Sequence, residues 1–176
     1  LGIANVLASK GANLVINGFG DAAAIEAERA NLEAKYGVKV VYSGADISKP
    51  ADVKAMVELC VSSFGSVDIL VNNAGIQYTE SVEAFPAERW DAIIAINLSG
   101  IFHAIQAALP HMKAKGFGRI INIASVHGLI GSVHKVAYVA AKHGVVGMSK
   151  VVALETAGTG VTCNTICPGW VHTPLV

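Results

Sequence analysis

The chain has 176 residues, of which 53% are apolar and only 15% are charged, so material for a large core is plentiful. Lys and Arg together number 13, equal to Asp and Glu, and no basic run is present, which argues against a nucleic-acid binder. This length fits one domain and leaves no room for a separate second one.

Short apolar runs alternate with longer segments of helical periodicity along the chain. Glycine or proline stands at most of the boundaries, where each favours a turn or a helix end. In chain order we predict a helix over Leu1–Lys10, a strand over Asn13–Asn17, a helix over Ala22–Tyr36, a strand over Val38–Tyr42, a helix over Pro50–Phe64, a strand over Val67–Val71, a helix over Pro86–Lys113, a strand over Arg119–Ala124, a helix over Val136–Thr156 and a strand over Val161–Ile166.

Strands that are apolar on both faces and separated by helices predict a parallel sheet covered on both sides. With right-handed crossovers this gives a doubly wound, Rossmann-like α/β fold, whose ligand site lies at the carboxyl ends of the strands. Such a fold opens with a strand and a glycine-rich turn, whereas this chain opens with a helix and stops in a loop at Val176. We therefore expect residues 1–176 to form a single dinucleotide-binding and catalytic domain that is incomplete at both ends.

A tyrosine and a lysine one helical turn apart are the sharpest chemical signal. Tyr138 and Lys142 are four residues apart on one helix face, and Ser125 stands thirteen residues before Tyr138 at a strand end. A tyrosine that exchanges a proton with an alcohol must overcome a free pKa of about 10. A lysine ammonium within about 4–6 Å favours the phenolate. Ser125 would then hold the substrate oxygen while Tyr138 takes or gives the proton.

Five motifs in the same order resemble those of the short-chain dehydrogenase/reductase family. They are Asn72-Asn73-Ala74-Gly75, Asn97, Ser125, Tyr138-x-x-x-Lys142 and Pro168-Gly169. The resemblance implies a catalytic tetrad of Asn97, Ser125, Tyr138 and Lys142, in which Asn97 would hold a water that links Lys142 to solvent. The alternative for Asn97 is a side chain that bends its helix by bonding to its own backbone.

The resemblance also implies a nicotinamide dinucleotide as the cofactor. The loop Asn17–Gly20 carries no Arg or Lys to receive a 2′-phosphate, which favours NAD over NADP, although the usual acidic residue is absent too. Asp46 could instead be only a helix cap, and Pro168-Gly169 only a turn. The family assigns cofactor contacts to Phe19, Asp46, Ile47, Asn73, Ala74, Gly75, Tyr138, Lys142, Pro168, Gly169, Val171 and Thr173.

Gln77, His127 and Lys135 surround the expected position of the reacting alcohol with one cation and two neutral polar groups. Such a set suits a small substrate that bears a carboxylate. Lys135 could instead be a solvated residue at a helix start, and His127 a loop residue bonded to backbone. With Trp170 as an apolar wall for a methyl group, the predicted substrate-binding set is Gln77, Ser125, His127, Lys135, Tyr138 and Trp170.

Within the family, five stretches are similar to the branch of bacterial D-3-hydroxybutyrate dehydrogenases: Asn17–Gly20, Ala124–Leu129, Tyr138–Val146, Val152–Gly160 and Cys167–Val171. This resemblance implies oxidation of D-3-hydroxybutyrate to acetoacetate with NAD, and a C-terminal lid that we do not find in this sequence. One rival is another short-chain reductase that acts on a 3-oxoacyl or sugar-alcohol substrate, which has no need of a cation at Lys135. The other is a non-catalytic fragment, against which the intact tetrad argues.

The resemblance further implies a homotetramer in which the helix of Tyr138 packs against its mate. A face of small residues would permit this approach, or would pack on the chain's own sheet: Ala137, Ala140, Ala141, Gly144 and Gly147.

The cysteines and histidines predict neither disulfides nor a metal site. Cys60, Cys163 and Cys167 lack the paired spacing of ligands, and we interpret them as reduced thiols of a cytoplasmic protein. The six histidines are scattered. We expect no transmembrane helix and no membrane partner, because we recognise no apolar run of about 18–20 uncharged residues. No signal peptide is apparent, but the first residue is Leu1 rather than methionine, so targeting stays open.

Overall fold

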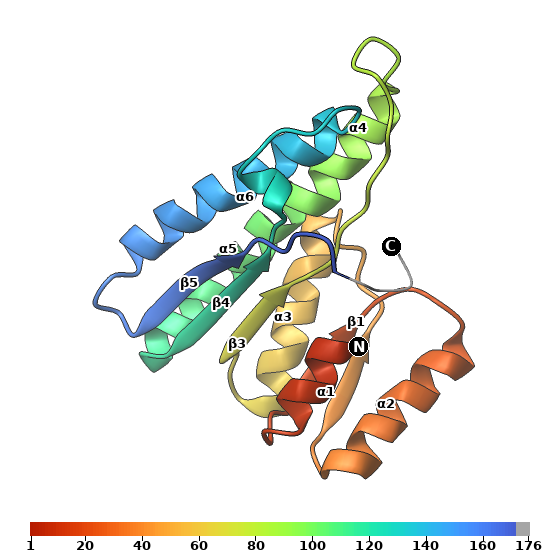
Figure 1. Ribbon diagram of the computed structural model, residues 1–176. Coiled ribbons are helices and arrows are strands. Elements are labelled where there is room, and N and C mark those ends of the chain that lie inside the picture. Colours follow the sequence, from red (N-terminus) through yellow and green to blue (C-terminus); the bar gives the residue numbers. More distant parts are fainter. Residues whose placement is uncertain (172–176) are drawn as a thin grey trace.

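The computed structural model describes residues 1–171, in which helices and parallel strands alternate (Figure 1). The strands are β1 (Leu14–Asn17), β2 (Val40–Ser43), β3 (Ile69–Asn72), β4 (Gly118–Ile123) and β5 (Val161–Ile166). The helices are α1 (Gly2–Ala8), α2 (Ala22–Tyr36), α3 (Pro50–Phe64), α4 (Ala87–Ile94), α5 (Gly100–Lys115) and α6 (Val136–Glu155). The predicted α/β class with parallel strands is therefore confirmed.

The five strands form two sheets where the sequence predicted one. β1 pairs with β2, and β3, β4 and β5 pair in that order, with every pairing parallel. A complete doubly wound sheet has the strand order 3-2-1-4-5-6, in which the first strand lies between the second and the fourth. The two sheets of this chain part at the corresponding place, between β1 and β3. Helix α3 contacts β1 and packs on α5, so it connects the two sheets.

Helices α5 and α6 share one face of the three-stranded sheet. Burial alternates along β4, where Gly118, Ile120 and Asn122 are buried and the residues between them are half-buried. Gly118 faces α5, since a Cβ there would lie 2.5 Å from the sulfur of Met112. Asn122 faces α6 through a hydrogen bond to Ser149. The main core is made by Val57, Val67, Ile101, Ile105, Ala108, Met112, Ile120, Ala124, Val145, Val152, Val161 and Cys163.

Local signals explain most helix ends. The Asp21 side chain accepts a hydrogen bond of 2.9 Å from Ala24 N and caps α2, which ends at Gly37 with φ 67°. The predicted bounds of Ala22–Tyr36 and Pro50–Phe64 are thus confirmed. The single long helix predicted over Pro86–Lys113 is instead two α-helices joined by a π-helical turn, Ala95–Ser99.

This composite helix also corrects the view that the sequence has no long apolar run. Ala87–Lys115 is long and apolar enough to cross a membrane, by length and composition. In the structure, Ile101, Ile105 and Met112 on one of its faces are buried in the core beside β4. The apolar composition is therefore that of a helix packed into the domain.

Candidate active site

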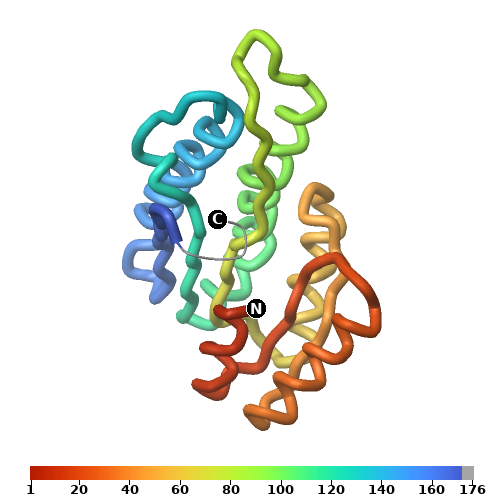
Figure 2. The backbone as a smooth tube through the Cα atoms, turned by 45° about the vertical axis from the view of Figure 1, so that its right-hand side comes forward, coloured from red at the N-terminus to blue at the C-terminus, as the bar shows by residue number. Residues whose placement is uncertain are grey.

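The loops that follow β4 and β5 lie side by side at the carboxyl ends of their strands, as Figure 2 shows. Ala124 N donates a hydrogen bond of 2.8 Å to Ile166 O, and Val126 N donates one of 2.8 Å to Pro168 O. These two bonds place Ser125 beside Cys167. The motifs predicted at separate strand ends therefore meet at one edge of the sheet, as expected for parallel strands.

Lys142 reaches this edge from α6 and is almost completely buried. Its side chain is 3% exposed, and its Nζ donates a hydrogen bond of 2.7 Å to Ile123 O at the end of β4. Burial lowers the pKa of Lys142 to about 8, and the nearby Cys167 acts in the opposite direction. The ammonium lies 5.5 Å from the centre of the Tyr138 ring. The predicted tyrosine–lysine pair is therefore in contact, with the lysine anchored to the sheet.

Ser125 and His127 lie next to this pair. The Ser125 hydroxyl is 8% exposed and accepts a hydrogen bond of 3.2 Å from His127 N. The His127 ring stands edge-on to the Tyr138 ring, with centroids 6.3 Å apart. His127 Nδ1 is buried and has no hydrogen-bond partner among residues 1–171. A buried polar atom without a partner costs about 1–3 kcal/mol, so this nitrogen is suited to receive a ligand.

Lys135 stands where α6 begins, with its ammonium over the exposed ring of Trp170. The distance from Nζ to the ring centroid is 5.6 Å, within the range of a cation–π interaction. Lys135 itself is half-buried. The ammonium therefore rests on an indole that is itself exposed, at the helix start where the alternative of a solvated lysine also placed it.

Asn97 lies in the π-helical turn and is completely buried. Its Oδ1 accepts a hydrogen bond of 2.9 Å from Ile76 N, and its Nδ2 donates one of 2.8 Å to Ile76 O. The side chain therefore bonds to the loop after β3 and not to its own helix, which the alternative interpretation assumed. A Cβ at Gly75 would lie 3.5 Å from Asn97 Oδ1, so the loop and the helix are in close contact.

The predicted cofactor residues after β3 and β5 line the same edge. Asn73, Ala74, Gly75, Gly169 and Val171 are exposed there. The position of Thr173 lies outside the described residues. Exposed backbone at the carboxyl ends of parallel strands is the usual surface for a dinucleotide.

The predicted contacts near β1 and β2 are less uniform. Phe19 is 76% exposed in the loop after β1, whereas the carboxylate of Asp46 is occupied by its neighbour Ser48. Hydrogen bonds from the Ser48 hydroxyl and amide hold the pKa of Asp46 below its usual value. Ile47 lies over the first turn of α5, where a Cβ on Gly100 would come within 2.5 Å of it.

A buried series of hydrogen-bonded side chains behind the site was not predicted from the sequence; we call it the polar chain. Asn72 Nδ2 donates to Asn122 Oδ1 over 2.8 Å, and Asn122 Nδ2 donates to Ser149 Oγ over 2.8 Å. Ser149 Oγ donates in turn to Val145 O over 2.7 Å. An asparagine between two isoleucines in a buried strand was the available signal, because such a group requires partners. The chain fixes the end of β3, from which the Asn-Asn-Ala-Gly loop departs.

A second missed contact lies at the end of β1. Asn17 Nδ2 donates hydrogen bonds of 2.9 Å to Ser43 O and to Ala45 O, and the Tyr42 hydroxyl donates one of 2.8 Å to Gly18 O. Asn17 thereby ties the ends of β1 and β2 together, and a neutral amide stands at this strand end.

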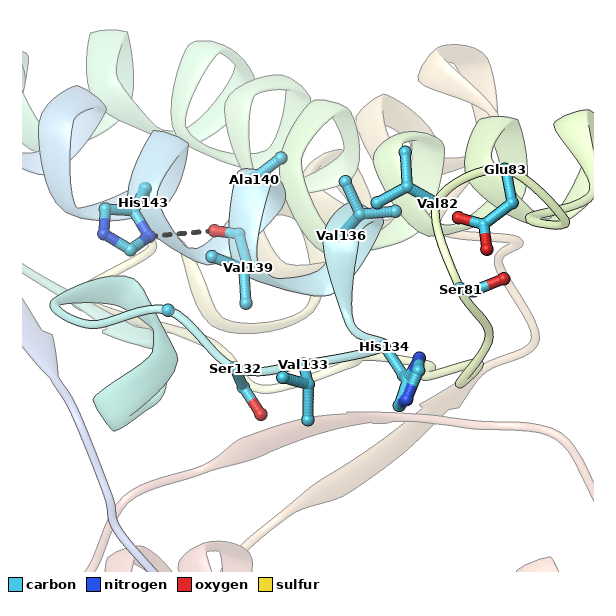
Figure 3. A pocket seen from close by; sticks show the side chains of 11 residues that line it. Ser81, Val82, Glu83, Ser132, Val133, His134, Val136, Val139, Ala140 and His143 are labelled. Atoms are coloured by element: carbon cyan, nitrogen blue, oxygen red, sulfur yellow. Dashed lines mark hydrogen bonds between the residues drawn. The ribbon is translucent and has the colours of Figure 1, made fainter.

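A groove of about 830 Å³ lies on the other face of α6 (Figure 3). Val136, Val139, Ala140 and His143 project into it from the helix, opposite two loops. Those loops contribute Ser81, Val82, Glu83, Gly131, Ser132, Val133 and His134. None of the predicted tetrad lines the groove, so the groove is separate from the sheet edge that carries Ser125 and Lys142. We call that sheet edge the catalytic edge.

The small residues of α6 fall into two groups, one packed inside the chain and the other exposed. Ala137 and Ala141 are completely buried in a cluster with Ile93, and a Cβ on Gly144 would lie 3.0 Å from Leu98. These residues therefore pack on the chain's own helical segments and not on its sheet. The remaining two, Ala140 and Gly147, are exposed.

Comparison with known proteins identifies the family. The family model described as short chain dehydrogenase matches residues 1–176. The chain belongs to the short-chain dehydrogenase family. This short-chain dehydrogenase is 62% identical over 176 residues to the D-beta-hydroxybutyrate dehydrogenase of Cupriavidus necator. The matched region covers 100% of this chain and 67% of that protein. It is 53% identical to the enzyme of that name from Rhizobium meliloti, with 100% and 68% covered. It is 40% identical over 169 residues to a 3-oxoacyl-[acyl-carrier-protein] reductase of Staphylococcus aureus, with 96% and 68% covered.

Proposed function

We propose that this protein oxidises D-3-hydroxybutyrate to acetoacetate and that the hydride passes to NAD. The observation that carries the proposal is the His127 ring, with its unpartnered Nδ1, edge-on to the ring of Tyr138, whose centre lies 5.5 Å from the Lys142 ammonium. Lys135 stands at the start of the same helix. The identities of 62% and 53% to D-beta-hydroxybutyrate dehydrogenases support the same substrate.

In the proposed reaction, the Tyr138 phenolate takes the proton of the substrate hydroxyl as the carbon–hydrogen bond breaks. The Lys142 ammonium, held at Ile123 O, favours the phenolate over the phenol because it is a buried cation near the ring. Ser125 Oγ donates a hydrogen bond to the same substrate oxygen. NAD, when bound beside Tyr138, would supply the acceptor for the hydride. Asn97 would serve the return of the proton to solvent by holding a water near Lys142 through its main-chain carbonyl, because both polar atoms of its side chain bond to Ile76.

The proposed cofactor is NAD. The exposed loop of Asn73, Ala74 and Gly75 provides space on the adenosine side, flanked by Phe19, Asp46 and Ile47, and Pro168, Gly169, Val171 and Thr173 would hold the nicotinamide side. The neutral end of β1 supports NAD, since the Asn17 amide is committed to two carbonyl groups and Asn17–Gly20 contains no cation for a 2′-phosphate.

Gln77, His127 and Lys135 would bind the substrate carboxylate, with Trp170 alongside. Gln77 is exposed two residues after Gly75, and His127 offers its unpaired nitrogen. A charge-assisted contact from Lys135 distinguishes an anionic substrate from a neutral alcohol. A cytoplasmic location is proposed on the three free cysteines.

We propose a homotetramer built partly on the exposed side of α6. This side carries Ala140 and Gly147 together with Val151, 54% exposed, and Leu154, 78% exposed, and Phe102 of α5 is 46% exposed. Exposed apolar side chains gathered on long helices favour association.

A second candidate function is reduction of a 3-oxoacyl thioester, which the 40% identity to the Staphylococcus aureus reductase supports. The test is the rate of NADH formation with D-3-hydroxybutyrate, the L-enantiomer and a neutral secondary alcohol, together with the rate of NADH consumption with a 3-oxoacyl thioester. Oxidation of the D-enantiomer alone, with a KM raised at least tenfold in Lys135→Ala and unchanged in Lys150→Ala, is expected. Turnover of the neutral alcohol or of a 3-oxoacyl thioester, without activity on D-3-hydroxybutyrate, would refute the proposal.

A further inference from the structure

Lys135 and Trp170 come from different segments and meet at the mouth of the candidate site. The 5.6 Å separation between Nζ and the ring centroid suits attraction between an ammonium and the negative face of an indole. Among residues 1–171, Lys135 forms no ion pair, although other lysines on the surface do. The indole is therefore the interaction that locates this cation.

The position of the indole is set by the backbone of the catalytic edge. Val126 lies between Ser125 and His127, and its amide donates a hydrogen bond of 2.8 Å to Pro168 O, two residues before Trp170. The Trp170 side chain is 82% exposed, so packing in the core does not hold it. The turn that presents Ser125 and His127 thus also carries the loop from which Trp170 reaches Lys135.

We propose that Trp170 is a positioning residue that acts through Lys135. The stacked indole keeps the ammonium at the mouth of the site before substrate arrives. A free lysine side chain loses rotamer freedom when it binds an anion, and a lysine that is already ordered loses less. The inference rests on the proposed function for the carboxylate as the group that Lys135 receives. It assigns Trp170 a role different from that of a wall for the substrate's methyl group.

A double-mutant cycle separates these roles. Trp170→Leu removes the π-system and retains an apolar side chain. The expected result is a KM for D-3-hydroxybutyrate raised roughly threefold to tenfold, with kcat changed less than about twofold, and partial recovery in Trp170→Phe. In a Lys135→Met background, Trp170→Leu should leave KM unchanged. An equal rise of KM in both backgrounds would show that Trp170 acts without Lys135, and the proposal would be overturned.

A fluorescence measurement tests the pairing without turnover. The protein has two tryptophans, so Trp90→Phe leaves Trp170 as the reporter. Its emission should differ between this variant and the same variant with Lys135→Met, and should not change with the control Lys150→Met, which alters an exposed lysine of α6. Identical emission from all three overturns the pairing, even if the protein oxidises D-3-hydroxybutyrate. A difference confined to Lys135→Met supports it, even if that substrate is not oxidised.

Discussion

The two sheets of this molecule are stabilised by cores of different size. The catalytic half, which we define as β3, β4 and β5 with α5 and α6, contributes most of a core of twelve buried residues and contains the buried polar chain Asn72–Asn122–Ser149. The nucleotide half, β1 and β2 with α1 and α2, has a core cluster of four: Ala8, Leu14, Leu32 and Val40.

Surface interactions support the nucleotide half where its core is small. Arg29 forms ion pairs of 2.7 Å with Glu26 and with Glu33, and exposed pairs of this kind contribute little to stability. The proposed proton-transfer groups are therefore attached to the half with the larger buried core. The proposed adenosine contacts are attached to the half with the smaller core, which we expect to open more easily.

The largest expected effect concerns the group that moves the proton. Tyr138→Phe retains the ring that packs beside His127 and Lys142 and removes the hydroxyl. We expect kcat for alcohol oxidation to fall by about 10²–10⁴-fold, because general base catalysis is lost, while the protein stays folded. Steady-state kinetics together with circular dichroism would check this. A kcat within tenfold of the parent would mean that another group takes the proton.

A pair of core substitutions tests the unequal stability of the halves. Ile120→Ala and Leu32→Ala each remove a completely buried side chain, at a cost of about 2–5 kcal/mol. Ile120→Ala should lower the free energy of unfolding of the whole domain, measured with urea. Leu32→Ala should raise amide hydrogen exchange mainly in α2 and β2. Equal increases in α2 and α6 after Leu32→Ala would show that the halves unfold as one unit.

The buried lysine predicts a stability that rises with pH. The folded pKa of Lys142, about 8, lies below the usual lysine value of 10.5, so between these values the unfolded chain binds a proton that the folded chain has released. Folding should therefore gain roughly 3 kcal/mol as pH rises from about 8 to about 10.5. Lys142→Met should remove that gain. Urea unfolding of both proteins across this range measures it, and parallel pH profiles would contradict it.

The smallest effect concerns the polar chain behind the site. Ser149→Ala leaves the buried Asn122 amide with only the weak sulfur acceptor of Cys163 and should cost about 1–3 kcal/mol. The control, Ser62→Ala, removes an exposed hydroxyl bonded to Leu59 O and should change stability by less than about 0.5 kcal/mol. Denaturant midpoints compare the two. Equal losses in the two variants would mean that the chain does not stabilise the catalytic half.

The pattern of residues predicted the elements and the meeting of Tyr138, Lys142 and Ser125, because helical spacing and parallel strands are local or regular features. It did not predict the partner of Asn97, since Ile76 lies far away in sequence and bonds through its backbone, which carries no compositional signal. The parting of the sheet falls between β1 and β3, which is the place of the first strand in the doubly wound order. The stacking of Lys135 on Trp170 likewise depends on a loop geometry that spacing does not encode.

The contact between Ile47 and Gly100 crosses the boundary between the two halves. A Cβ at Gly100 would approach both the side chain and the carbonyl oxygen of Ile47, at 2.5 and 2.6 Å. Any larger residue there would push outward the segment that carries Asp46 and Ile47. The space available on the proposed adenine side therefore depends on the absence of a side chain at Gly100, the first residue of α5. A substitution at Gly100 would therefore change the affinity for the proposed nucleotide although it replaces no residue that touches the nucleotide.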